Sequence, residues 1–239
     1  MGATVRALGA CLWFAVVSVT LSAAGAAQGS VASNQSDASV APQNGGTAQA
    51  VDGIAARIED DIITESEVRE LAAFQLLVDG KSKPRAELIR ELVDQWATRG
   101  EADAEKFPVP SAADVNNAYA QLAMQFGGAK NFDSRAAAVE LNEAAVRRLL
   151  GQQLYLSRFL DYRFRPAVQV DDAEIEAYYR DEFAPQVKER GQPVPSIENV
   201  QETIREVLVQ RAITQRANEW LDNTRGHLQV EPIHEGDAR

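Results

Sequence analysis

Few side chains in this sequence are of the types that bind metals or move protons. The two histidines, His227 and His234, lie seven positions apart near the C-terminus, with Glu231 and Glu235 beside them. Imidazole and carboxylate groups can hold a zinc ion, but the ligands must converge on one point. Because side chains alternate across a strand, a strand here places His227 and Glu231 on one face and His234 on the other. The pattern therefore favours exposed tail residues over a metal site.

The remaining reactive groups also favour structural roles. The acid pairs Asp60-Asp61 and Asp171-Asp172 could act in acid–base chemistry, yet such pairs are typical of turns and helix caps. The one cysteine, Cys11, lies in a segment that we expect to be removed. The sequence contains no glycine-rich phosphate loop, no His-Glu-x-x-His and no Gly-x-Ser-x-Gly motif. We therefore predict no catalytic residue, no metal ligand and no cofactor.

The charge balance argues against nucleic acid as a partner. The 239 residues include 35 acidic and 24 basic side chains, for a formal net charge of −11. Sequence-independent binding to nucleic acid depends on Lys and Arg to neutralise phosphates. Arginines do cluster in one predicted helix, which in so acidic a protein is typical of a salt-bridged face. They are Arg147, Arg148, Arg158, Arg163 and Arg165.

Residues 1–27 are typical of a secretory signal peptide. Arg6 precedes an uncharged apolar run, and small residues in a small-x-small pattern follow Leu21. Retention as a membrane anchor is the alternative, because the uncharged stretch 7–27 is long enough to span a bilayer. We expect cleavage, since the last third of this stretch is only weakly apolar. The mature protein would then be periplasmic or otherwise extracytoplasmic, with no stable membrane span and a net charge of −12 (23 basic against 35 acidic side chains).

The composition divides the rest of the chain into three parts. Residues 28–50 hold one charge, no aromatic residue and mostly Ser, Ala, Gln, Asn and Gly, so we expect a flexible linker. From residue 51 onward, apolar residues recur at strand and helix spacings, which predicts a single folded domain over 51–233. Residues 234–239 are expected to form a short tail.

The folded part is predicted to be mainly helical, with short strands at both of its ends. Gly53–Ile58 alternates in the manner of a strand, and Ile62-Ile63 follows a predicted turn. Thr64 and Glu67 have the spacing of a capping box, which marks the start of a helix. The stretch His227–Ile233 alternates again, and we expect it to pair with Gly53–Ile58 in a small sheet. Further helices are predicted over 84–98, 111–125, 132–141, 143–165, 171–183 and 196–225, with a loop over 184–195.

Helical spacing also predicts which side chains are buried. In the helix 143–165, Leu156, Leu160 and Phe164 define the main apolar stripe, and Tyr155 and Phe159 lie beside it. A second apolar face indicates either deep burial or the wall of a groove. The first helix, which ends at Gly80, is predicted to bury Val68, Leu71, Ala72, Gln75 and Leu76.

Three segments of the folded part carry a family resemblance. The first, 51–68, reads VDGIAARIEDDIITESEV, the second, 170–179, reads VDDAEIEAYY, and the third is the closing helix and strand, 197–233. Together they resemble the SurA-like periplasmic chaperones and their foldase relatives of the PrsA and PpiD type. The first segment is similar to that family's opening strand, turn and helix start, and the second to the segment that precedes its isomerase domain. The resemblance implies a mainly α, helical SurA N-domain-like chaperone module with a small β-sheet formed by N- and C-terminal strands.

The sequence departs from this family where the relatives carry a parvulin prolyl-isomerase domain. Only 12 residues, Ala184 to Pro195, separate the second and third segments. Chains below about 40 residues usually need disulfides, metals or oligomerisation to fold, so no such domain fits here. The histidines of a parvulin active site are also missing from this stretch. We therefore expect no isomerase activity and a protein that is not an enzyme.

The resemblance implies an ATP-independent extracytoplasmic chaperone. Its expected partners are unfolded or nascent exported polypeptides, including those of the outer membrane. Two alternatives remain, namely a peptidyl-prolyl cis-trans isomerase-family enzyme and a non-catalytic scaffold of an envelope complex. Under the chaperone hypothesis, the predicted peptide-binding groove consists of Met124, Phe126, Phe132, Tyr155 and Phe159.

Overall fold

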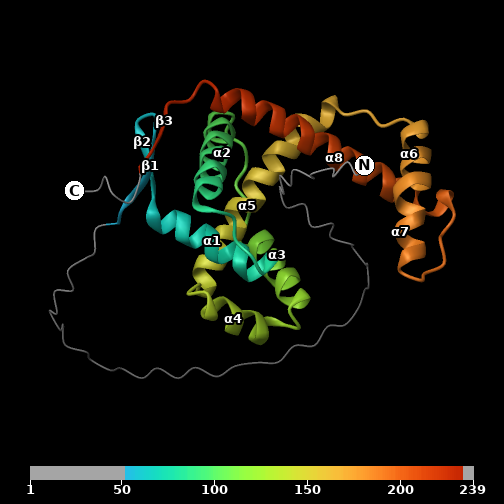
Figure 1. Cartoon of the computed structure of the whole chain (residues 1–239), viewed down its shortest axis with the longest axis horizontal. Helices are drawn as coiled ribbons and strands as arrows, with labels where there is room; N and C mark the ends of the chain where they lie inside the picture. Colours follow the sequence, from blue (N-terminus) through green and yellow to red (C-terminus); the bar gives the residue numbers. More distant parts are fainter. Residues whose placement is uncertain (1–51, 234–239) are drawn as a thin grey trace, which may run out of the picture. The chain divides into compact units, whose positions relative to one another are not determined.

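The computed structural model describes residues 52–233, so the predicted signal peptide 1–27, the linker 28–50 and the tail 234–239 lie outside the described residues (Figure 1). The strands are β1 (Ile54–Ile58), β2 (Asp61–Thr64) and β3 (Val230–Pro232). The helices are α1 (Glu65–Asp79), α2 (Arg85–Ala104), α3 (Ala112–Gln125), α4 (Ala129–Ala138), α5 (Glu143–Phe164), α6 (Asp172–Tyr178), α7 (Ala184–Glu189) and α8 (Ile197–Arg225). A 3-10 turn (Arg165–Ala167) follows α5, and a π-helical turn (Tyr179–Phe183) joins α6 to α7. The fold is mainly helical with one small antiparallel sheet, as predicted.

The two ends of the described chain meet in this sheet. Strand β1 lies in the middle and pairs antiparallel with β2 on one side and with β3 on the other. Across the β1–β3 pair, Arg57 lies opposite Glu231 and Ile58 lies opposite Val230. The predicted pairing of the C-terminal strand with Gly53–Ile58 is therefore confirmed. Because these strands are joined by nearly the whole domain, the sheet closes the fold.

Local caps set the ends of several helices. The Thr64 hydroxyl accepts a hydrogen bond from the Glu67 amide at 3.2 Å, and the Glu67 carboxylate accepts one from the Thr64 amide at 2.8 Å. This predicted capping box begins α1, and a box of Asp171 and Glu174 begins α6 in the same way. Helix α1 ends at Gly80, whose φ of 71° is left-handed and suits glycine. Both boxes satisfy amide groups that the first helical turn leaves unpaired.

Several expectations about element ends are wrong, and the helix predicted over 132–141 spans Ala129–Ala138. Helix α2 was predicted to end before Arg99 but continues to Ala104, because Thr98 and Ala102 on its inner face are buried. The predicted loop 184–195 begins with helix α7, since Pro185 occupies a first turn, where its missing N–H is no loss. Strand β3 starts only at Val230, because the residues before it form the turn that ends α8.

One residue of the predicted α1 stripe is also misplaced. Leu76 is 46% exposed, whereas its neighbour Leu77 is buried. The first half of α1 packs on the sheet through Val68 and Leu71, and the second half packs on a different cluster through Leu77. The buried face therefore rotates along the helix, which a single stripe does not describe.

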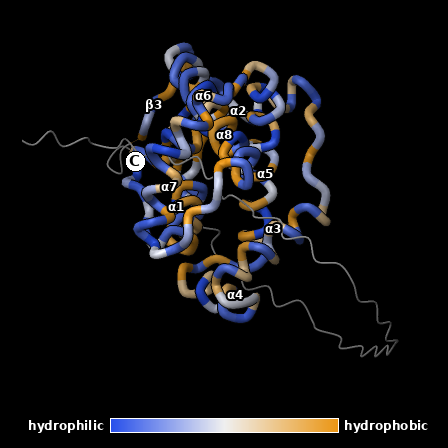
Figure 2. Tube along the Cα trace, turned by 90° about the vertical axis from the view of Figure 1, so that its right-hand side faces the viewer, coloured by the Kyte–Doolittle hydropathy of each residue, from blue (hydrophilic) through white to orange (hydrophobic). Residues whose placement is uncertain are grey.

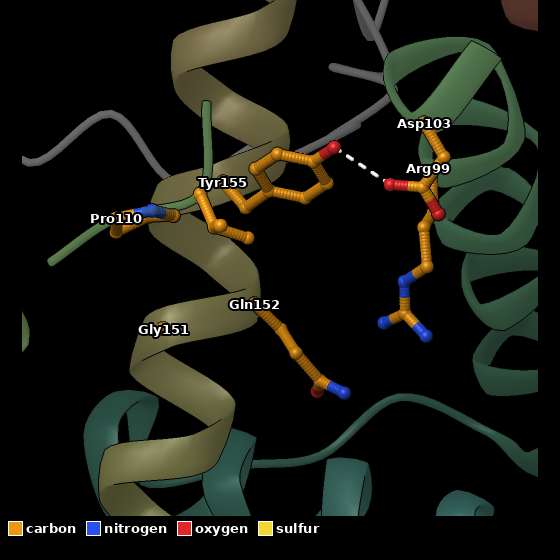
Figure 3. A pocket seen from close by; sticks show the side chains of 7 residues that line it. Arg99, Asp103, Pro110, Gly151, Gln152 and Tyr155 are labelled. Carbon is orange, nitrogen blue, oxygen red and sulfur yellow. Dashed lines mark hydrogen bonds between the residues drawn. The ribbon is translucent and has the colours of Figure 1, made fainter. Parts of the chain in front are cut away.

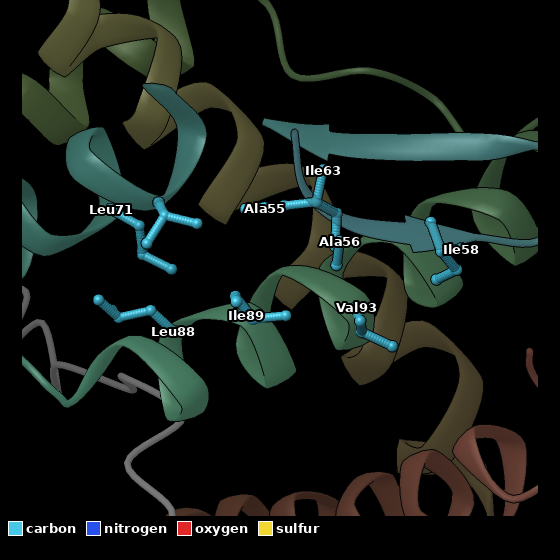
Figure 4. Close-up of a cluster of buried hydrophobic side chains, with 9 residues drawn as sticks. Ala55, Ala56, Ile58, Ile63, Leu71, Leu88, Ile89 and Val93 are labelled. Carbon is cyan, nitrogen blue, oxygen red and sulfur yellow. The ribbon is translucent and has the colours of Figure 1, made fainter. Parts of the chain in front are cut away.

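Three clusters of buried side chains hold the described domain together. One lies between the sheet, α1 and α2, where Ala55 and Ala56 let α2 approach β1 closely (Figure 4). A second joins the end of α1 to α3, α4 and the first half of α5, around Phe132. The third joins the end of α2 to the second half of α5, around Phe159. Hydrophobic and hydrophilic residues are interspersed along the helices, as expected of amphipathic helices that pack through one face (Figure 2).

Helix α8 connects an arm, made of α6 and α7, to α2 and α5 (Figure 1). Salt bridges join α8 to the arm, with Arg205 to Asp172 at 3.0 Å and Arg211 to Glu182 at 2.8 Å. At the other end of α8, Arg225 pairs with an aspartate of α2. Within residues 52–233, no helix is both long enough and apolar enough to cross a membrane.

Candidate functional site

The structure separates the five residues of the predicted groove. Phe132 lies in the α3–α4–α5 cluster, and Tyr155 and Phe159 lie in the cluster between α2 and α5. Phe132 and Phe159 have no exposed surface, whereas Met124, at the end of α3, is 75% exposed. Phe126 is half-buried, with its ring centre 5.3 Å from that of Phe132. The two fully buried rings are core in this conformation, so a bound peptide would not contact them.

An open cavity of about 320 Å³ lies between the C-terminal half of α2 and the middle of α5 (Figure 3). Its size falls at the lower end of the usual range for ligand pockets. Tyr155 is the residue of the predicted groove that borders it. The full lining consists of Arg99, Asp103, Val109, Pro110, Gly151, Gln152 and Tyr155.

The segment between α2 and α3 supplies the apolar wall of the cavity. The ring of Phe107 packs against Tyr155 with centres 5.9 Å apart, which anchors the start of the segment. The chain then runs through Pro108-Val109-Pro110, where each residue before a proline is held away from helical conformation. This extended stretch leaves Val109 77% exposed. An apolar side chain is thus kept at the surface beside the cavity.

The polar groups of the cavity fall into two sets. The Tyr155 hydroxyl donates a hydrogen bond of 2.7 Å to the Asp103 carboxylate. Burial, together with this carboxylate, raises the pKa of Tyr155 to about 12, so the hydroxyl stays protonated at neutral pH. Arg99 and Gln152 have no hydrogen bond or ion pair within the described part of the chain. Their polar ends point toward one another across the opening (Figure 3).

The arginines of α5 contrast with Arg99, because every one of them is ion-paired. Arg158 lies 2.8 Å from Asp114, and this contact, with hydrogen bonds from Ser111, lowers the pKa of the Asp114 carboxyl. The salt-bridged face predicted from the sequence is therefore confirmed. The other pairs of α5 are Arg147–Glu143, Arg148–Glu70, Arg163–Glu101 and Arg163–Glu105. Just after the helix, Arg165 pairs with Asp161 and Glu206.

Several of the groups suggested for metal or acid–base chemistry have structural partners. Asp61 accepts a hydrogen bond of 3.1 Å from the indole of Trp96, which lowers the pKa of its carboxyl. Asp172 pairs with Arg205, and His227 bonds a backbone carbonyl one turn earlier at 2.8 Å. The second histidine lies outside the described residues. Among the residues that the structure describes, no group of His, Cys, Asp and Glu side chains could hold a metal ion.

Sequence reasoning missed Arg99, Val109 and Gln152 as neighbours in one cavity. The available signal was the Pro-Val-Pro stretch, which exposes an apolar residue between two rigid positions. Arg99 and Gln152 carry no comparable signal, because each is an ordinary polar residue of a helix. No protein-family model and no curated protein matches the chain.

Proposed function

We propose that residues 52–233 form an ATP-independent chaperone module that holds extended segments of unfolded polypeptides. The module acts outside the cytoplasm on exported proteins, in the manner of the SurA-like chaperones, and performs no catalytic step of its own. The observation that supports this most strongly is the open cavity with an apolar wall beside the exposed Val109. Single exposed apolar side chains are common on protein surfaces, but Val109 is held at the edge of a cavity.

The size of the cavity fits one client side chain and its flanking backbone. At about 320 Å³ it has no room for a folded element. Burying one Leu or Phe side chain contributes about 1.5–3 kcal/mol. Micromolar affinity requires about 8 kcal/mol, so binding through this cavity alone is weak. Weak, non-directional contact suits a protein that must accept and release many different chains.

Other exposed apolar side chains add further weak contacts for a long client. Met124, Leu76 and Tyr162 are exposed on α3, α1 and α5. One unfolded chain that touches several such points gains avidity without any single strong site. The net charge of −11 favours solubility of the chaperone itself, whereas its unfolded clients tend to aggregate.

Suppression of aggregation tests the proposal. A urea-unfolded outer-membrane protein is diluted into buffer with the full chain at a near-equal molar ratio, and light scattering is followed. We expect less scattering, and we expect Val109→Ser to weaken the effect more than Met124→Ser. These residues are matched in exposure, at 77% and 75%, but only Val109 lines the cavity. If Met124→Ser weakened the suppression of scattering more than Val109→Ser, the client would bind at the end of α3 instead.

Two outcomes would replace the chaperone function with an alternative. Acceleration of prolyl cis–trans isomerisation in a short peptide by the purified chain would make it an enzyme. Failure to reduce scattering, combined with one tight partner recovered from an envelope extract, would support the scaffold.

A further inference from the structure

We infer that the cavity selects client segments in which an acidic side chain adjoins a large apolar side chain, with Arg99 and Gln152 binding the carboxylate. This inference rests on the proposed function and specifies the class of segment that the same site takes. It rests on charge complementarity between the cavity and its ligand.

The first argument is that Arg99 lacks the ion pair that each arginine of α5 has. All four arginines of α5, and Arg165 just after it, contact carboxylates. Arg99 has no ion pair among the described residues, although it lies in an acidic protein. The Gln152 amide is likewise unengaged and faces it across the opening (Figure 3). A guanidinium and an amide N–H group are donors that a carboxylate can bridge, and such charge-assisted bonds are stronger than neutral ones.

The second argument is that the apolar and the cationic surfaces lie on different sides of the same cavity. Pro110 lies on one side of α5 and Arg99 on the other, with the ring of Tyr155 between them (Figure 3). Val109 extends the apolar side. Successive side chains of an extended peptide point in opposite directions. An apolar residue followed by an acidic residue can therefore present one side chain to each surface.

The opposing charges do not cancel this preference. Asp103 also borders the cavity, but it accepts the hydrogen bond from Tyr155 at the other end of the opening from the Arg99 guanidinium. The net negative charge of the whole protein repels acidic ligands from a distance. At 0.1 M salt that repulsion is screened beyond about 10 Å, whereas a contact with Arg99 is not. The nearest cation therefore decides the preference at the site.

Fluorescence anisotropy with the full chain tests the inference. The probes are blocked, labelled peptides in a Gly/Ser background that differ at one position, carrying Phe-Glu, Phe-Gln or Phe-Lys. We expect Phe-Glu to bind about three- to tenfold more tightly than Phe-Gln, as a charge-assisted hydrogen bond at an open site predicts. Arg99→Gln should abolish this difference, and Arg216→Gln, which removes an exposed arginine of α8 outside the cavity, should preserve it.

Each remaining outcome would overturn the inference in a recognisable way. Equal binding of the three peptides, unchanged by Arg99→Gln, refutes the acidic preference and leaves the chaperone function intact. Absence of peptide binding together with failure to suppress aggregation refutes both. A neutral peptide with a free C-terminal carboxylate that binds as tightly as Phe-Glu, and loses this affinity in Arg99→Gln, would assign the cavity to chain ends instead of acidic side chains.

Discussion

Replacing Phe132 by Ala tests whether this ring belongs to the core or to a binding surface. Phe132 is fully buried, and its ring centre lies 5.4 Å from that of Tyr119 and 5.3 Å from that of Phe126. Truncation removes the buried apolar surface and leaves a cavity, which typically costs about 3–5 kcal/mol. For a domain of this size each kcal/mol corresponds to roughly 2–4 °C, so we expect the Tm to fall by about 6–20 °C.

Urea unfolding followed by far-UV circular dichroism measures the free energy of unfolding directly. Met124→Ala is the matched control, because Met124 comes from the same predicted groove but is 75% exposed. We expect the control to change the free energy of unfolding by less than about 0.5 kcal/mol. If Phe132→Ala cost no more than this control, the burial of Phe132 would be refuted and the ring would return to the candidate binding surface.

Three further predictions concern stability. Gly100→Ala should stabilise the protein by about 0.5–1 kcal/mol in thermal unfolding, because a β-carbon there meets nothing within 4 Å and alanine favours helix α2; a loss would argue against a regular helix at this position. Arg225→Met should lower the free energy of unfolding by about 2 kcal/mol at neutral pH, because it leaves the buried carboxylate of Asp94 without its ion-pair partner. Burial already raises the pKa of this carboxyl. An unchanged unfolding midpoint would show that this ion pair between α2 and α8 contributes nothing to stability. The lowered pKa of Asp114 means that its bond to Arg158 stabilises the fold above the ordinary carboxyl value of 3.8 and loses this effect as the pH falls below it. Unfolding curves across this range should therefore vary less with pH in Asp114→Asn, and an identical pH profile would contradict the pair.

Several elements could be predicted from the sequence because the interactions that form them are local. The box of Thr64 and Glu67 joins residues three positions apart, so its pattern is visible without any knowledge of the fold. The same holds for the box of Asp171 and Glu174. The end of α1 at Gly80 depends on one left-handed residue, which glycine favours. The pairing of the end strands was also predictable, since short apolar strands need partners to satisfy their backbone groups.

The faces of these elements depend on neighbours that are distant in sequence. Leu76 and Leu77 are equally apolar, and only the position of the α3–α4–α5 cluster decides that Leu77 is the buried one. The same applies to Phe132, which fits a groove wall by its type but is enclosed by α3, α4 and α5.

The sequence by itself determined the helical class, the caps and the charge of this protein, because composition and short-range spacing control them. Only the tertiary structure decided which residues form the candidate site. It brings Val109, from the segment after α2, and Gln152 of α5 to the same cavity, and it leaves Arg99 without the carboxylate that Arg158 has. Burial and ion pairing depend on which atoms come within a few ångströms, and that is a property of the folded chain.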